Sequence, residues 1–249
     1  MNDFKKLMKK LRPNILSIYE GDMEIEIKED KSPLTLADKY VHKEIESFLK
    51  ENYPYPILSE EGKDIEYSER KNWKKFWLVD PIDGTKEFIK KNGEFTVNIA
   101  LIENGKPVFG AIYIPVKDIL YYGDKKGSFK VEDLSTGEKS TMLPDRNIKK
   151  TDKIKIVASR SHISEETKQF IESIEGEKEI ISVGSSIKLC LVAEGIADIY
   201  PRFSPTMEWD IAAGHAIVNG ANKRVIEEGK DTEIVYNKEN LLNPNFKAM

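Results

Sequence analysis

Two aspartates stand three residues apart at the end of an apolar run. The run Trp77-Leu-Val-Asp80-Pro-Ile-Asp83-Gly-Thr85 predicts a buried strand that delivers Asp80 and Asp83 into a turn shaped by a proline and a glycine. Mg²⁺ and other hard cations take oxygen ligands, chiefly carboxylates with some carbonyls and waters. The spacing therefore favours a metal site, and an acidic surface turn without chemistry is the competing interpretation.

Three other motifs match the sequence only in part. An EF-hand loop needs polar ligands at alternate positions before its glycine, and Pro81 and Ile82 break that pattern. The Asp-x-Asp-Gly-Thr motif of haloacid-dehalogenase phosphatases would require its nucleophilic aspartate where Pro81 stands. Ser185-Ser-Ile-Lys188 matches the Ser-x-x-Lys of penicillin-recognising enzymes, but neither Ser-Asp-Asn nor Lys-Thr-Gly accompanies it.

Three acidic segments resemble, in order, the metal-binding signatures of the inositol-monophosphatase superfamily. They are Ser59-Glu60-Glu61-Gly62, the run from Asp80 to Thr85, and Glu208-Trp-Asp210-Ile-Ala-Ala-Gly. The resemblance is closer to one branch, the 3′(2′),5′-bisphosphate nucleotidases of the bacterial CysQ type. Inositol monophosphatases usually have Gly-Thr-Thr-Asn-Phe where this chain has Gly84-Thr-Lys-Glu-Phe, and the stretch that follows, Gly-Glu-Phe-Thr-Val-Asn-Ile-Ala, is similar to the same branch.

The resemblance implies two or more Mg²⁺ ions and a pair of residues that activates water. One ion would be held by Glu60, Asp80 and the main-chain carbonyl of Ile82, and a second by Asp80, Asp83 and Asp210. Asp38 and Thr85 would orient and deprotonate the attacking water. From the residues alone, Thr35-Leu-Ala-Asp38 favours a helix-capping box and Asp210 a helix N-cap, and capping does not exclude chemistry.

The resemblance implies a substrate-binding set that lies mostly in the second half of the chain. Gly184, Ser185 and Ser186 stand where a strand should enter a helix, so that their N–H groups and hydroxyls would meet an anion. Lys188 and Arg202 would neutralise a second phosphate. The remaining residues of this set are Gly84, Thr85, Ser159 and His162.

The elements that must position these residues follow from hydrophobic spacing. Phe4, Leu7, Met8 and Leu11 predict two short helices at the start of the chain, and residues 36–49 repeat the helical pattern. Strands are predicted at 56–59, 76–79, 95–101, 108–114 and 119–122, with Asn104-Gly105 as a hairpin turn. The second half alternates strands at 155–158, 180–183 and 196–200 with helices at 165–174, 186–193 and 210–218. The polar stretch 133–151 would connect the halves.

Composition excludes several classes of protein. The 249 residues carry 39 Lys+Arg against 43 Asp+Glu, a formal net charge of −4, so broad phosphate neutralisation on a nucleic-acid polymer is not expected. One cysteine and three histidines exclude an internal disulfide, a cysteine-rich zinc site and a histidine-only metal site. The sequence contains no apolar run of membrane-span length. We therefore expect a cytoplasmic protein, with loose peripheral association with the inner membrane left open.

These observations define the expected fold and function. We expect one catalytic unit over residues 1–249, with an α+β half at 1–140 and an α/β half at 151–249, layered as the αβαβα sandwich that the resemblance implies. It would be a monomer or homodimer that hydrolyses the 3′-phosphate of adenosine 3′,5′-bisphosphate to AMP and phosphate. The alternatives are activity on inositol monophosphates or fructose 1,6-bisphosphate, and a non-catalytic protein that binds a phosphorylated nucleotide or senses Mg²⁺.

Overall fold

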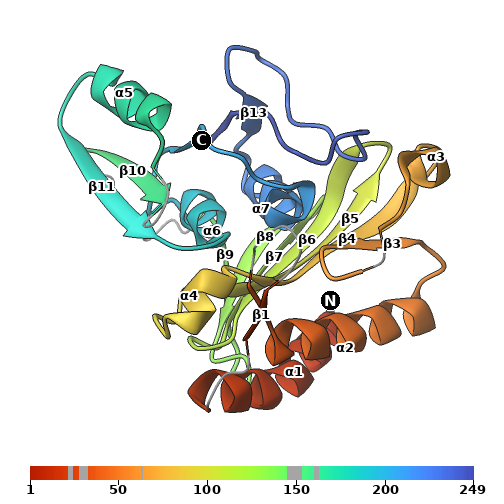
Figure 1. The fold of residues 1–249 in the computed structure, drawn as a ribbon. Helices are drawn as coiled ribbons and strands as arrows, with labels where there is room; N and C mark the ends of the chain where they lie inside the picture. The colour runs from red at the N-terminus through yellow and green to blue at the C-terminus, as the bar shows by residue number, and fades with distance from the viewer. Residues whose placement is uncertain (22–24, 28–32, 63, 145–152, 160–162) are drawn as a thin grey trace.

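A seven-stranded mixed sheet is the centre of the molecule (Figure 1). The computed structural model describes residues 1–21, 25–27, 33–62, 64–144, 153–159 and 163–249. The strands lie in the order β3-β4-β5-β6-β7-β8-β9, in which β3 and β4 are parallel and every other pair is antiparallel. Their bounds are β3 Ile57–Ser59, β4 Lys75–Asp83, β5 Thr96–Glu103, β6 Lys106–Ile114, β7 Ile119–Asp124, β8 Gly127–Glu132 and β9 Lys139–Leu143.

Helices cover both faces of this sheet, and two hydrophobic clusters mark the two contacts. On one face of the sheet, α1 (Asn2–Glu20) and α2 (Leu36–Asn52) pack against alternate side chains of β4, among them Trp77 and Val79. On the other face α6 (Ile187–Glu194) and α7 (Glu208–Gly220) pack against the intervening residues, Phe76 and Leu78 among them. The alternation within β4 is that of a strand buried on both sides.

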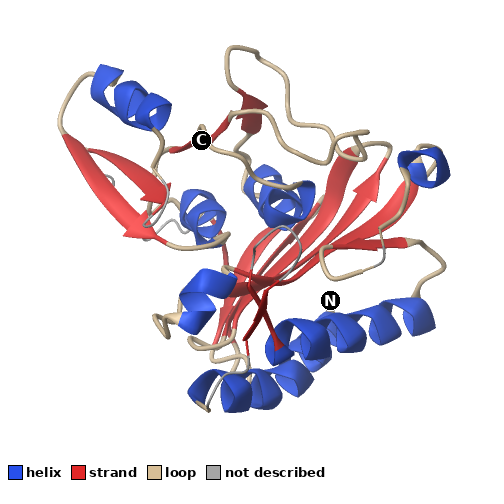
Figure 2. Cartoon of the chain, in the orientation of Figure 1, coloured by secondary structure: helices blue, strands red, loops and turns tan. Residues whose placement is uncertain are grey.

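The second half of the chain adds a further sheet and an outer helix (Figure 2). Strands β10 (Ile154–Ser159) and β11 (Lys178–Val183) are parallel, and a bridge from Ile156 to Ile199 joins β10 to the segment entering β12 (Tyr200–Arg202). β14 (Phe246–Ala248) pairs with both β12 and β13 (Val225–Glu227). With α5 (Glu165–Ser173) on the outside, the layers run helix, sheet, helix, sheet, helix, as the sequence predicts.

The structure differs from the sequence-based expectations at α1, β8, β9 and β12. The first helix, α1, is one element of 19 residues that contains the exposed Pro13. Its buried face continues past the proline at Ile15 and Tyr19, and this packing keeps the helix as one element. Within the expected connection 133–151, residues 139–143 form the edge strand β9, and the preceding strand β8 was also not predicted. The strand expected at 196–200 begins only at Tyr200.

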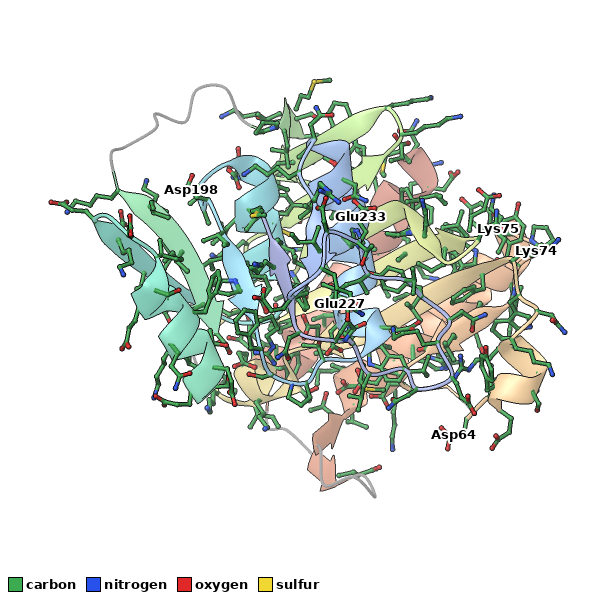
Figure 3. All side chains as sticks on the ribbon, turned by 90° about the horizontal axis from the view of Figure 1, so that it is seen from above. Asp64, Lys74, Lys75, Asp198, Glu227 and Glu233 are labelled. Atoms are coloured by element: carbon green, nitrogen blue, oxygen red, sulfur yellow. The ribbon has the colours of Figure 1, made fainter. Side chains whose placement is uncertain are left out.

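Shorter elements complete the described chain. They are the antiparallel pair β1 (Ile25–Ile27) and β2 (Pro33–Thr35) and the short helices α3 (Tyr67–Arg70) and α4 (Thr85–Ile89). Viewed from above, Asp198 beside the second sheet and Lys74 with Lys75 at the start of β4 lie at opposite ends of the molecule (Figure 3).

Helix α7 lies unusually close to the central sheet. A Cβ atom on Gly110 of β6 would come within 2.1 Å of the carbonyl oxygen of Ala213, so only glycine permits this approach. A Cβ on Gly214 would likewise come within 2.3 Å of Leu189 in α6. These contacts fix the position of the N-terminal end of α7, where Asp210 lies.

Candidate active site

A pocket of about 120 Å³ opens where the end of β4, the start of α6, β12 and the start of α7 meet. Asp83 and Asp210 line it from opposite halves of the chain. Its other polar lining residues include Gly84, Ser159, Gly184, Ser185, Ser186, Lys188 and Arg202. The structure thus brings together seven of the residues assigned to substrate binding, although their contacts with a substrate remain a prediction. His162, also assigned to that set, lies outside the described residues.

A break in strand pairing places the two aspartates of β4. Asp80 pairs with Asn98 and Asp83 with Thr96, so the register shifts between them, as in a β-bulge. Gly84 follows with φ +89°, a left-handed conformation that suits glycine, and α4 begins at Thr85. The Thr85 hydroxyl donates to the carbonyl oxygen of Ile82 at 3.3 Å.

Asp80 is the most deeply buried carboxylate of this group. Its side chain is 1% exposed, and within the described part of the protein its Oδ1 has no hydrogen-bond partner. Burial raises the pKa of Asp80 well above its ordinary value, and the charges of Glu60, Asp83 and Asp210 raise it further. Four carboxylates therefore interact here without enough positive charge to balance them, which is the electrostatic condition that a bound cation relieves.

Asp83 and Asp210 keep part of their surface open to the pocket. Removal from bulk water is nevertheless the largest cause that raises the pKa of each carboxyl. For Asp83 the charge of Lys188 opposes this rise. For Asp210 the charge of Asp83 adds to it.

The donor set fits a hard cation, although the side chains are not arranged as a finished metal cage. Among the described residues, no group of three or more Asp, Glu, His or Cys side chains has the arrangement of a metal cluster. The reason is visible in two contacts: Oδ2 of Asp83 accepts from the N–H of Ser186 at 2.5 Å, and Oδ2 of Asp210 from the N–H of Met207 at 2.8 Å. The orphaned Oδ1 of Asp80 and the all-oxygen donors still match what Mg²⁺ binds.

Local hydrogen bonds test the capping roles predicted for Asp38 and Asp210. Oδ2 of Asp38 accepts from the N–H of Thr35 at 2.8 Å and from its hydroxyl at 2.5 Å, so the capping box at the start of α2 is confirmed. Asp210 was expected at the N-cap of α7, and that expectation is wrong. It stands three residues further in and bonds the N–H of the cap residue, Met207.

The turn at the start of α6 is already engaged by carboxylates. The N–H of Gly184 donates to Oε2 of Glu94 at 2.8 Å, and the N–H of Ser186 to Asp83. Two of the N–H groups expected to face an anion are therefore directed at side chains of the first half. Ser185, with φ +45°, stands between them.

Lys188 and Arg202 supply the positive charge of the pocket. Lys188 is 5% exposed, and its Nζ donates to the carbonyl oxygens of Ser185 and Val183. Burial lowers the pKa of Lys188 to about 8, while the charge of Asp83 opposes this change. Nη2 of Arg202 donates to the carbonyl oxygen of Pro205 at 3.2 Å.

Sequence reasoning missed several polar residues at this site. Thr96 and Asn98 are fully buried on β5, and Glu87 and Glu94 lie beside the turn of α6. Thr96 and Asn98 alternate with apolar residues in a strand that is otherwise hydrophobic. That alternation could have indicated that Thr96 and Asn98 share one face of the strand. The structure pairs them across the strands with the two aspartates of β4.

Comparison with known proteins identifies the family. Residues 4–248 match the Inositol monophosphatase family, and the chain belongs to it. The 3′(2′),5′-bisphosphate nucleotidase CysQ of Salmonella typhimurium is 44% identical over 238 residues, which cover 94% of this chain and 93% of that protein. The protein of the same name from Escherichia coli K12 is 42% identical with the same coverage.

The solved structures agree with this assignment. The crystal structure of CysQ from Bacteroides thetaiotaomicron, described as a bacterial member of the inositol monophosphatase family, has a TM-score of 0.89 and 47% sequence identity. The match covers 99% of this chain and 96% of that one. The resemblance and the layered fold predicted from the sequence are thereby confirmed. No helix in the described ranges has the length and hydrophobicity needed to cross a membrane.

Proposed function

We propose that the protein is a Mg²⁺-dependent phosphomonoesterase that removes the 3′-phosphate of adenosine 3′,5′-bisphosphate and yields AMP and phosphate. The CysQ relatives, which are named as 3′(2′),5′-bisphosphate nucleotidases and are 42% to 44% identical over 94% of the chain, support this substrate. The observation that carries the proposal is the meeting of Asp80, Asp83, Asp210 and Glu60 beside a pocket that contains Lys188 and Arg202. Acidic groups for metal and basic groups for phosphate are both needed for this reaction.

The residues that would hold Mg²⁺ are those that supply carboxylate or carbonyl oxygens around Asp80. They are Glu60, Asp80, the carbonyl of Ile82, Asp83 and Asp210. When bound, the metal supplies a more acidic water and charge stabilisation for the transferring phosphoryl group. Two ions, rather than one, are part of the proposal.

Within the protein, Asp38 and Thr85 have the groups required to move a proton. The carboxylate of Asp38 is held in place by the capping box of α2, and this fixes its orientation. Thr85 can pass a proton through its hydroxyl and hold the water by its oxygen. Asp38 would then accept the proton as the water oxygen bonds to phosphorus and the bond from phosphorus to the sugar oxygen breaks. The sugar oxygen would take up a proton from solvent and leave as the hydroxyl group of AMP.

Lys188 and Arg202 are proposed to bind the second phosphate of the substrate. Both line the pocket, and the fork of Arg202 can hold two phosphate oxygens. Ser159, Ser185 and Gly84 would contribute polar contacts around the nucleotide. The placement of His162 in this set, the separate halves at 1–140 and 151–249, the cytoplasmic location and the oligomeric state stay predictions.

A parallel phosphate-release assay tests the substrate. The full chain is incubated in Mg²⁺ with adenosine 3′,5′-bisphosphate, inositol 1-phosphate or fructose 1,6-bisphosphate, and kcat/KM is compared. We expect the nucleotide to be preferred. A preference for the inositol or sugar phosphate would show that the proposed substrate is wrong and would leave the proposed reaction unchanged. Tight nucleotide binding with no phosphate released from any of the three would favour the non-catalytic alternative.

A further inference from the structure

Two polar residues at the start of β5 are buried among apolar neighbours in the sequence. Thr96 is 0% and Asn98 is 1% exposed, in a strand whose neighbours Phe95, Val97 and Ile99 belong to the hydrophobic core. Burial of a hydroxyl and an amide is unfavourable unless their hydrogen bonds are satisfied. The partners of these two side chains therefore show what the burial achieves.

The Thr96 hydroxyl connects a metal-ligand candidate of the first half with the α6 turn of the second. It lies 3.5 Å from Oδ2 of Asp83 on the adjacent strand. It also lies 2.8 Å from Oγ of Ser186 and 3.3 Å from Oγ of Ser185. The same Oδ2 of Asp83 accepts the N–H of Ser186, so the carboxylate, the hydroxyl and the turn form a closed group.

Asn98 extends this group to the second aspartate. Its Oδ1 accepts from the hydroxyls of Thr96, at 3.0 Å, and Ser186, at 2.9 Å. Asn98 is the cross-strand partner of Asp80, and such pairs project from the same face of a sheet. Nδ2 of Asn98 and Oδ1 of Asp80 are both buried and lack a partner in the described part of the chain. The two atoms therefore do not bond each other, and Asp80 adjoins the group through strand pairing.

We propose that Thr96 and Asn98 are positioning residues that hold the carboxylate of Asp83 and the turn at Ser186 as one unit next to Asp80. The inference rests on the proposed function, because it concerns the affinity of that site for its metal. Its specific consequence is that loss of the Ser186 hydroxyl weakens metal binding before any phosphate is present. A turn that served only the substrate would not have this effect.

The experiment titrates Mg²⁺ or Mn²⁺ alone into the full chain by calorimetry, without phosphate. Thr96→Val removes the hydroxyl at nearly constant volume, and we expect metal affinity to fall about tenfold. Thr96→Ser restores the hydroxyl and should return affinity to within about twofold of the parent protein. Ser186→Ala should weaken binding about fivefold. Ser128→Ala, which removes a buried hydroxyl bonded to Ile217, is the control and should bind metal normally.

The outcomes separate this inference from the proposed function. If the parent protein binds metal and both Thr96→Val and Ser186→Ala bind it equally well, the positioning role is wrong and the proposed function stands. If Thr96→Ser is as weak as Thr96→Val, the hydroxyl alone does not account for the affinity, and the inference is again wrong. If the parent protein binds no metal and releases no phosphate, the proposed function itself fails. Should Thr96→Val not fold, as judged by circular dichroism, Ser186→Ala decides.

Discussion

The N–H of Gly184 donates to Oε2 of Glu94 at 2.8 Å, across 90 positions of the sequence. This bond joins the turn that begins α6 to the segment that enters β5. A second bond, from Ser186 to Asp83, joins the same turn to the end of β4. The pocket is therefore assembled by contacts between the halves, and the position of its turn depends on residues of the first half.

The close contact around Gly184 makes it sensitive to one added methyl group. A Cβ there would lie 2.9 Å from Cγ of Glu87 and 3.0 Å from the carbonyl oxygen of Glu94, so Gly184→Ala must shift the turn. We expect KM for the phosphorylated substrate to rise about tenfold or more, since small displacements of binding groups are costly. Gly137→Ala is the matched control, because a Cβ there would meet no described atom within 4 Å. Equal KM values for the two variants would contradict this account of the turn.

Removing one negative charge from the acidic group tests the metal assignment. We expect Asp83→Asn and Asp210→Asn each to lower kcat by about 100-fold or more at saturating Mg²⁺, and to weaken metal binding measured without substrate. The physical reason is that an amide oxygen binds a hard cation less strongly than a carboxylate does. Near-normal turnover in either variant would show that its carboxylate is not a metal ligand.

Asp38 combines a structural and a chemical role that one substitution can separate. Asp38→Asn keeps an oxygen that can accept from the N–H of Thr35, so the free energy of unfolding should fall by only about 1 kcal/mol. The variant cannot take up a proton at this position, and kcat should fall by about 100-fold or more. Urea denaturation and kcat are measured on the same preparation. If kcat falls only in proportion to the fraction of protein that is unfolded, Asp38 acts as a helix cap and has no chemical role.

His215 predicts a pH dependence of stability that has no connection with catalysis. It is fully buried in α7, its Nδ1 lies 2.9 Å from the Tyr236 hydroxyl, and among described atoms its Nε2 has no partner. Burial lowers the pKa of His215 from 6.5 to about 3, so between these values the unfolded chain binds the additional proton. The stability from this group is full above pH 6.5 and is lost as pH falls toward 3.

The size of this effect can be measured as a difference between two proteins. Between pH 7 and pH 5 His215 should cost about 2 kcal/mol of unfolding free energy. His215→Gln, which cannot titrate, should lack this part of the loss. His42→Gln is the control, because His42 is partly exposed and bonds Ser59 instead. The prediction is wrong if His215→Gln and the parent protein lose stability equally over this range.

Local patterns in the sequence predicted those features of the site that are set by residues close together in the chain. Asp80 and Asp83 were found because an apolar strand, a proline and a glycine surround them, and the Asp38 cap because its partner is three residues away. The bond from Glu94 to Gly184 could not be predicted in this way, because no local pattern encodes a contact across 90 positions. Strand β9 was missed for another reason: it is an edge strand with mostly exposed residues, so hydrophobic alternation is weak there.

Helix α7 belongs to the second half of the sequence but covers the central sheet of the first. The contact between Gly110 and Ala213 shows that this cover is a tight backbone-to-backbone fit. During synthesis, which proceeds from the N-terminus, strands β4 to β8 emerge well before residues 208–220. One apolar face of the sheet therefore stays uncovered until α7 has been synthesised, and exposed apolar surface of this kind favours aggregation and chaperone binding in a nascent chain.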